Sequence, residues 1–133
     1  MTTYMYEDYG NRTPLRLYSF AHSFLSDLQK GLQTAHLVTE LSKTNSQLYW
    51  EWAQLDKTII ILDGGNTEQI LEVYRELCYF NTPHPKAIFR EDAKSLNGSA
   101  TCCGVIAPYN RSRSWSMSEL PPIEQFITQY RLA

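Results

Sequence analysis

The stretch "TIIILDGGNTEQILEVYREL", residues 58–77, predicts a strand, a turn and a helix in direct succession. Residues 58–62 are an uninterrupted run of β-branched and aliphatic side chains, which is typical of a buried strand. The letters "DGGN" predict a tight turn. Asn66 and Gln69 have the spacing of a capping box, which predicts the start of a helix. The stretch therefore predicts one strand–helix unit of an α/β domain.

The same alternation continues on both sides of this unit. Elements are predicted as a strand at 15–20, a helix from Ser26 or Asp27 to about Lys43, a short helix within 44–56, strands at 86–91 and 101–108, and a last helix within 120–132. No helix separates the last two strands, so they either pair antiparallel or stand apart in a mixed sheet. This order predicts helices on both faces of one sheet. The tyrosine-rich residues 1–14 are expected to form an arm before a single domain at 15–133.

Composition narrows the class of protein. The 133 residues are 43% hydrophobic and 20% charged, as in an ordinary globular domain. The net charge of −2 argues against broad, charge-driven binding of nucleic acid, although a local basic groove stays possible. The sequence has no apolar run of about 18 residues and no signal-peptide pattern at its N-terminus. We therefore expect a cytoplasmic protein without a membrane span.

The cysteines and histidines predict neither a disulfide framework nor a metal site. Cys78, Cys102 and Cys103 are odd in number and lack a CxxC spacing, so we expect reduced thiols that pack as small apolar residues. The three histidines are scattered along the chain. No metal and no cofactor is expected.

The first long helix carries two neighbouring stripes when its residues are placed at 100° intervals. Leu25, Leu28, Leu32 and Ala35 form an apolar stripe that predicts the face toward the core. Gln29, Gln33, His36 and Glu40 form a polar stripe beside it. A polar stripe bordering the core fits the wall of a binding cleft, and it fits a solvated helix face as well.

Three segments of the chain resemble the type 2 peptidyl-tRNA hydrolase family. "LQKGLQTAH" (28–36) resembles its GKxxxQxxH segment, with Gln33 and His36 at the matching positions. "DKTIIILDGGNTEQILEVYREL" (56–77) resembles its next strand and helix. "AIFREDAKSLNGSATCCGVIAP" (87–108) resembles its LIRDAGRTxIAPGTxTVLAIGP segment. There Arg90 and Asp92 match the Arg and Asp, and Gly98, Ser99 and Thr101 match the GTxT residues.

The resemblance covers residues 15–108 and implies a fold and an activity. The implied fold is a three-layer α/β/α domain with a four-stranded mixed sheet, commonly a homodimer. The implied activity is hydrolysis of the ester between peptide and tRNA, with Asp92 orienting a water molecule and Thr101 holding it. A lysine would supply positive charge to the transition state.

The departures from the family pattern concern that lysine and the nearby loops. The family's lysine falls on Gln29, which carries no charge. Lys30 is adjacent but lies about 100° further round the helix, so it replaces the lysine only if its side chain swings in. The loop between Asp92 and Gly98 is shorter than the pattern. One extra residue within "CCGVIAP" predicts a bulge.

A second group of residues suits ligand binding. "RSRSW" (111–115) places Arg111, Arg113 and Trp115 on one side of an extended stretch, where they would suit a phosphate and a stacked base. A solvated surface loop explains the same letters. With Gln29, Gln33, His36, Arg90 and Ser99 they complete the expected ligand-binding set, and Lys30, Asp92 and Thr101 are the expected catalytic set.

Three hypotheses of function remain from the sequence. The favoured one is a diverged scaffold whose cleft binds a nucleotide or a tRNA-derived ligand without efficient hydrolysis. Small diverged scaffolds of this kind can occur in phage genomes, so a sponge for a signalling nucleotide is one conceivable form of this hypothesis. The alternatives are an active peptidyl-tRNA hydrolase that uses Lys30, and a dimeric interaction module without a ligand.

Overall fold

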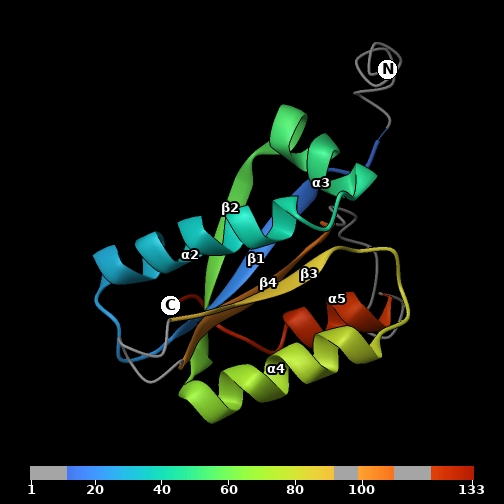
Figure 1. Ribbon diagram of the computed structural model, residues 1–133. Coiled ribbons are helices and arrows are strands. Elements are labelled where there is room, and N and C mark those ends of the chain that lie inside the picture. Colours follow the sequence, from blue (N-terminus) through green and yellow to red (C-terminus); the bar gives the residue numbers. More distant parts are fainter. Residues whose placement is uncertain (1–11, 92–98, 110–120) are drawn as a thin grey trace.

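The computed structural model describes residues 12–91, 99–109 and 121–133. A four-stranded mixed sheet lies between two helical layers, which confirms the predicted three-layer α/β/α fold (Figure 1). The elements are β1 (Leu15–His22), α2 (Asp27–Ser42), α3 (Gln47–Glu51), a π-helical turn (Trp52–Asp56), β2 (Thr58–Gly65), α4 (Thr67–Tyr79), β3 (Lys86–Arg90), β4 (Ala100–Pro108) and α5 (Pro122–Ile127). Helices α2 and α3 cover one face of the sheet, and α4 and α5 cover the other.

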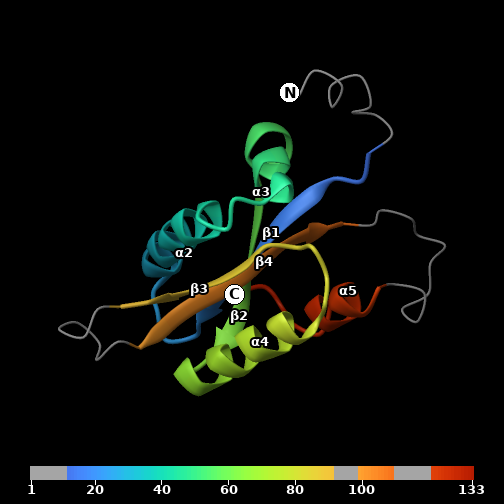
Figure 2. The ribbon, with the colours of Figure 1, turned by 45° about the vertical axis from the view of Figure 1, so that its right-hand side comes forward.

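The strand order is β2-β1-β4-β3. β1 and β2 pair in parallel, whereas β4 is antiparallel to both β1 and β3. The last two strands therefore pair antiparallel, which was one of the two predicted arrangements. The carboxyl ends of β1, β2 and β3 lie at the same end of the sheet as the amino end of β4 (Figure 2). In open α/β sheets, ligands bind beyond the carboxyl ends of the strands.

The core consists of two clusters, one on each face of the sheet. Phe20, Ile70 and Leu77 belong to the cluster under α4 and α5. Leu17, Leu37 and Leu41 belong to the cluster under α2 and α3. Burying a side chain of this size contributes roughly 1.5–3 kcal/mol. β4 lies between β1 and β3 and is buried on both faces, so it is one of the two inner strands of the sheet.

β2 differs from the buried strand that its sequence predicts. It is an edge strand, and Ile59 is 44% exposed. Its outer edge is partly covered by the last residues of the chain, because Asp63 N donates to Arg131 O (2.9 Å) and Ala133 N donates to Ile61 O (3.0 Å). A β-branched run suits any pleated surface, so it does not distinguish a central strand from an edge strand.

The boundaries of the predicted turn and of the last helix are also corrected. β2 continues through most of "DGGN", and the chain turns at Gly65, where φ is +83°. α5 ends at Ile127 rather than near 132, because the chain then leaves to pair with β2. The capping box of Asn66 and Gln69 is confirmed, and Ser26 and Gln29 form a second one at the start of α2.

The cysteines separate into two kinds. Cys102 and Cys103 are fully buried, as expected of small apolar residues. Cys78 is exposed, so the expectation that it packs in the same way is wrong. Burial raises the pKa of Cys102 to about 12, and it raises the pKa of Cys103 well above its usual value. Both buried thiols are therefore protonated at neutral pH.

Several predicted features lie outside the described residues. These are Asp92, Gly98, Arg111, Arg113, Trp115 and residues 1–11 of the predicted arm. Arg12, which the sequence placed in the arm, forms ion pairs with Asp56 (2.7 Å) and Glu51 (3.2 Å). Across the described ranges, we find no helix with both the length and the apolar character needed to cross a membrane.

Candidate functional site

The first half of α2 faces the sheet with a different side from the one that the sequence predicted. Phe24, just before α2, is 85% exposed, Leu28 is 75% exposed and Leu32 is 53% exposed. The stripe predicted to face the core therefore faces outward, except for the partly buried Leu25. The buried face is instead formed by Thr34, Leu37 and Leu41. Periodicity predicts that a helix has an apolar stripe, but it does not say which stripe meets the sheet.

This orientation directs polar side chains toward the sheet. Lys30 precedes Thr34 by four residues and therefore lies on the same face of α2. It is partly buried, as is Gln33. Thr34 is 3% exposed, and its hydroxyl lies 2.7 Å from the hydroxyl of Ser19 on β1, which satisfies both buried groups. The amino-terminal half of α2 thus presents a polar wall to the carboxyl end of the sheet.

Gln33 connects this polar wall to β4 through two contacts. Thr101 Oγ1 donates to Gln33 Oε1 at 3.0 Å, and Cys102 Sγ donates to the Gln33 backbone oxygen at 3.2 Å. Because Oε1 is used as an acceptor, the free atom of the amide is Nε2, which carries two donors. Every fully buried side-chain nitrogen and oxygen among the described residues has a partner, so Nε2 is accessible to solvent.

Two bulges occur at this end of the sheet. Phe89 pairs with Cys102 and Arg90 pairs with Ala100, so Thr101 is an extra residue in β4. In the same way, Gly64 is an extra residue opposite β1. The predicted bulge within "CCGVIAP" therefore falls one residue earlier, at Thr101. Bulges redirect side chains and are over-represented next to active sites.

A cavity of about 230 Å³ opens beside Thr101, and we call it the cleft. It is lined by His22, Phe24, Leu25, Thr67, Ser99 and Thr101. Phe24 N donates to His22 Nδ1 at 3.2 Å, so the neutral imidazole carries its proton on Nε2 and offers it as a donor. The sequence did not single out His22, Phe24 and Thr67 as site residues. The available signal was the position of His22 as the last residue of a strand parallel to its neighbour.

An aromatic pair lies on the α2 face near the cleft. His36, one turn after Gln33, stacks on Phe89 of β3 with ring centres 4.6 Å apart and planes 12° apart. Phe89 pairs with Cys102, the residue after Thr101. Arg90 follows Phe89 and is exposed at the end of β3. The structure thus gathers Gln33, His36, Arg90 and Thr101 at one end of the sheet, with Ser99 in the lining of the cleft.

Gln29 and Glu40 are placed elsewhere. Gln29 is the third residue of α2, and its Oε1 accepts a hydrogen bond from Ser26 N at 3.1 Å. Its amide therefore caps the helix that carries it and does not join Gln33 at the cleft. Glu40 forms an ion pair with Lys43 at 3.0 Å. The two outer members of the predicted polar stripe thus have local roles.

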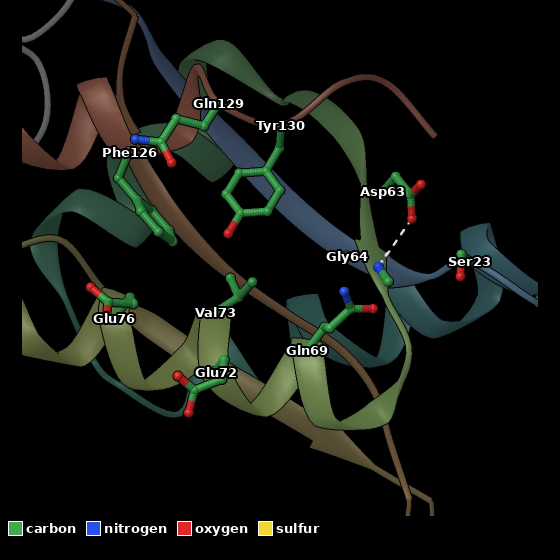
Figure 3. A pocket seen from close by; sticks show the side chains of 11 residues that line it. Ser23, Asp63, Gly64, Gln69, Glu72, Val73, Glu76, Phe126, Gln129 and Tyr130 are labelled. Carbon is green, nitrogen blue, oxygen red and sulfur yellow. Dashed lines mark hydrogen bonds between the residues drawn. The ribbon is translucent and has the colours of Figure 1, made fainter.

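A larger hollow of about 750 Å³ lies between α4, α5 and the carboxyl end of β2 (Figure 3). Among the described residues, its lining includes Asp63, Glu72 and Glu76, and no lysine or arginine. Asp63 Oδ1 accepts from Gly65 N at 3.0 Å. Carboxylates repel phosphates, so this hollow is less suited to a nucleotide than the smaller cleft.

Neither a metal cluster among the described residues nor a matching protein adds to this geometry of the candidate site. In the part of the chain that the structure describes, no group of three or more His, Cys, Asp or Glu side chains is arranged to hold a metal ion. No protein-family model matches the chain, and no curated protein matches it either.

Proposed function

We propose that the cleft binds a nucleotide or a nucleic-acid-derived ligand and that the protein hydrolyses peptidyl-tRNA poorly. The observation that carries the proposal is the orientation of the first half of α2. Polar Lys30, Gln33 and Thr34 face the sheet, while Leu28 and Leu32 face outward. Such an arrangement forgoes apolar burial, and local rules of stability are broken mainly at functional sites.

The groups around the cleft favour a ligand rich in acceptors and negative charge. Gln33 Nε2 and His22 Nε2 are donors, and Lys30 adds a positive charge on the same side of α2. Phosphate oxygens accept hydrogen bonds and attract cations. The stacked ring of His36 or Phe89 offers a platform for a base. A nucleotide combines these features in one molecule.

The same geometry disfavours efficient hydrolysis. The residue at the family's lysine position, Gln29, caps α2, and none of the described residues that line the cleft is a carboxylate. Removing one group that stabilises a developing oxyanion commonly costs a factor of 10² to 10³ in rate. A protein that sequesters a signalling nucleotide needs to bind it without hydrolysing it. The geometry of the cleft is therefore consistent with such a sponge. Free thiols fit a reducing compartment, from which we infer a cytoplasmic location.

One observation favours the alternative of an active hydrolase. Lys30 lies on the sheet-facing side of α2, so its side chain needs no large swing to reach the end of the sheet. In that case Lys30 supplies the charge that Gln29 lacks, Thr101 holds the water, and the lysine position has shifted by one residue.

Peptidyl-tRNA hydrolysis separates the two functions. The wild type, Lys30→Met and Gln29→Lys are compared at equal concentration. Lys57→Met, at the exposed residue that follows the π-helical turn, is the control. The proposal expects an inert wild type and stabilisation of the protein by at least one of the four nucleoside monophosphates. Cleavage by the wild type that disappears in Lys30→Met, but persists in Lys57→Met, would instead establish the hydrolase.

A further inference from the structure

A third cavity, of about 210 Å³, lies on the other face of the sheet from α2, and we call it the tyrosine pocket. It is lined by Arg16, Tyr18, Leu62, Pro108, Tyr109, Glu124, Ile127, Thr128 and Tyr130. Arg16 pairs with Ala107 near the amino end of β1, so the pocket opens toward the end of the sheet away from the cleft. It is separate from the site described above.

The tyrosine pocket contains one positive and one negative side chain that do not neutralise each other. Arg16 and Glu124 both line it, yet among the described residues neither forms an ion pair. Each is held by a different element, Arg16 by β1 and Glu124 by the first turn of α5. Opposite charges across one small cavity leave a space that a ligand with both charges can bridge.

The two charged groups are positioned in different ways. Arg16 Cζ lies 3.5 Å from the centre of the Tyr109 ring, so the guanidinium is held over the ring, and it also interacts with the Tyr18 hydroxyl. Its five N–H donors exceed what this one neutral partner can use. A guanidinium binds a carboxylate through two parallel hydrogen bonds. Glu124 is partly buried, and this burial raises the pKa of its carboxyl group. A bound cation would offset this effect.

The remaining surface of the pocket is apolar. Leu62, Pro108 and Ile127 contribute aliphatic walls. The volume is about that of seven water molecules at roughly 30 Å³ each, and it is below the roughly 300–1,000 Å³ of pockets that enclose drug-sized ligands. A small molecule with two charges and a short aliphatic group is of a size that this volume can hold.

We propose that the tyrosine pocket binds a free amino acid with an aliphatic side chain. Arg16 binds the α-carboxylate, Glu124 accepts hydrogen bonds from the α-ammonium, and Leu62 and Ile127 contact the side chain. Neither charged group is used in the proposed nucleotide site, so this pocket is a second and independent site of the protein.

Calorimetric titration of the full chain tests the proposal with three probes of similar shape. Leucine carries both charges, 4-methylpentanoate only the carboxylate, and 3-methylbutylamine only the ammonium group. We expect leucine to bind at least ten times more tightly than either analogue. Glu124→Gln should remove the advantage of leucine over 4-methylpentanoate, and Arg16→Gln its advantage over 3-methylbutylamine.

Matched controls are Glu68→Gln and Arg75→Gln, which change exposed charges of α4 outside the pocket and should leave the binding of leucine unchanged. The proposal is overturned if leucine shows no saturable binding to the wild type at millimolar concentration, or if it binds equally well to folded Glu124→Gln. The comparison of the three probes on the wild type remains decisive should either variant fail to fold.

Discussion

Thr101 of β4 donates a hydrogen bond from Oγ1 to Oε1 of Gln33 on α2, at 3.0 Å. The two residues are 68 positions apart in the chain. The bond joins the bulge at the end of β4 to the polar half of α2, and it fixes which end of the Gln33 amide is available to a ligand.

Replacing Thr101 with valine tests this connection. The change keeps the shape of the side chain but leaves Gln33 Oε1 without its donor, which should lower the free energy of unfolding by about 1 kcal/mol. It should also weaken nucleotide binding, because the amide is then free to rotate. Thr101→Ser retains the donor and is the control. If Thr101→Val and the wild type have the same free energy of unfolding in urea and the same affinity for the nucleotide, the hydrogen bond does not position the Gln33 amide.

Two glycines respond in opposite ways to a methyl group. A Cβ on Gly104 in β4 would collide with the Tyr18 backbone oxygen and come within 2.7 Å of Leu37 Cδ2. Gly104→Ala should therefore destabilise the protein by about 1–3 kcal/mol. A Cβ on Gly31 in α2 meets no atom within 4 Å, so Gly31→Ala should stabilise it by about 0.5–1 kcal/mol. Urea denaturation measures both, and equal effects of the two changes would refute the packing described here.

The two helix starts could be predicted because capping is local. Ser26 with Gln29, and Asn66 with Gln69, lie three residues apart and need no distant partner to signal the start of a helix. The strand–helix order similarly predicted the layers. The edge position of β2 could not be predicted, because it depends on which strand pairs with β1 on its other side.

The site was only partly predictable. The resemblance placed Gln33 and Thr101 in one site, and the structure brings them into contact. The bulges that shape the cleft depend on the register between strands, which a single segment does not reveal. The outward stripe of α2 was misassigned because apolar side chains such as Leu28 and Leu32 favour burial. Which face of the helix meets the sheet is decided by tertiary packing, which the helix sequence alone does not reveal.

Protonation of His84 should destabilise the folded protein. Burial, aided by the nearby charge of Lys86, lowers the pKa of His84 below its usual 6.5. The unfolded chain therefore binds the proton more tightly than the folded one, so stability is full above about pH 6.5 and falls as the pH drops through the folded-state pKa. Unfolding by urea at pH 7.5 and 5.5 should show a smaller decrease for His84→Gln than for the wild type. Equal decreases would mean that other groups cause the pH dependence.

An outward apolar ridge, formed by Phe24 just before α2 and by Leu28 and Leu32 within it, predicts self-association. Exposed apolar patches mark interaction sites, and an identical ridge on a second copy is complementary to it across a two-fold axis. Gly31 beside the ridge leaves room for a close approach of the two helices. Sedimentation should show a dimer at high concentration for the wild type and a monomer for the double variant Leu28→Glu, Leu32→Glu. A wild type that is monomeric at every concentration would exclude the homodimer.

The central claim is that the polar wall of α2 holds a nucleotide. It is tested most directly by calorimetric titration of the four nucleoside monophosphates into the wild type, Gln33→Glu and Gln54→Glu. Gln33→Glu replaces the donors at the cleft with a negative charge, whereas Gln54→Glu makes the same change at an exposed position of the π-helical turn. We predict saturable binding of at least one nucleotide to the wild type and to Gln54→Glu, and at least a ten-fold loss of affinity in Gln33→Glu. Binding that is equally tight in all three proteins, or absent from the wild type, would contradict the claim.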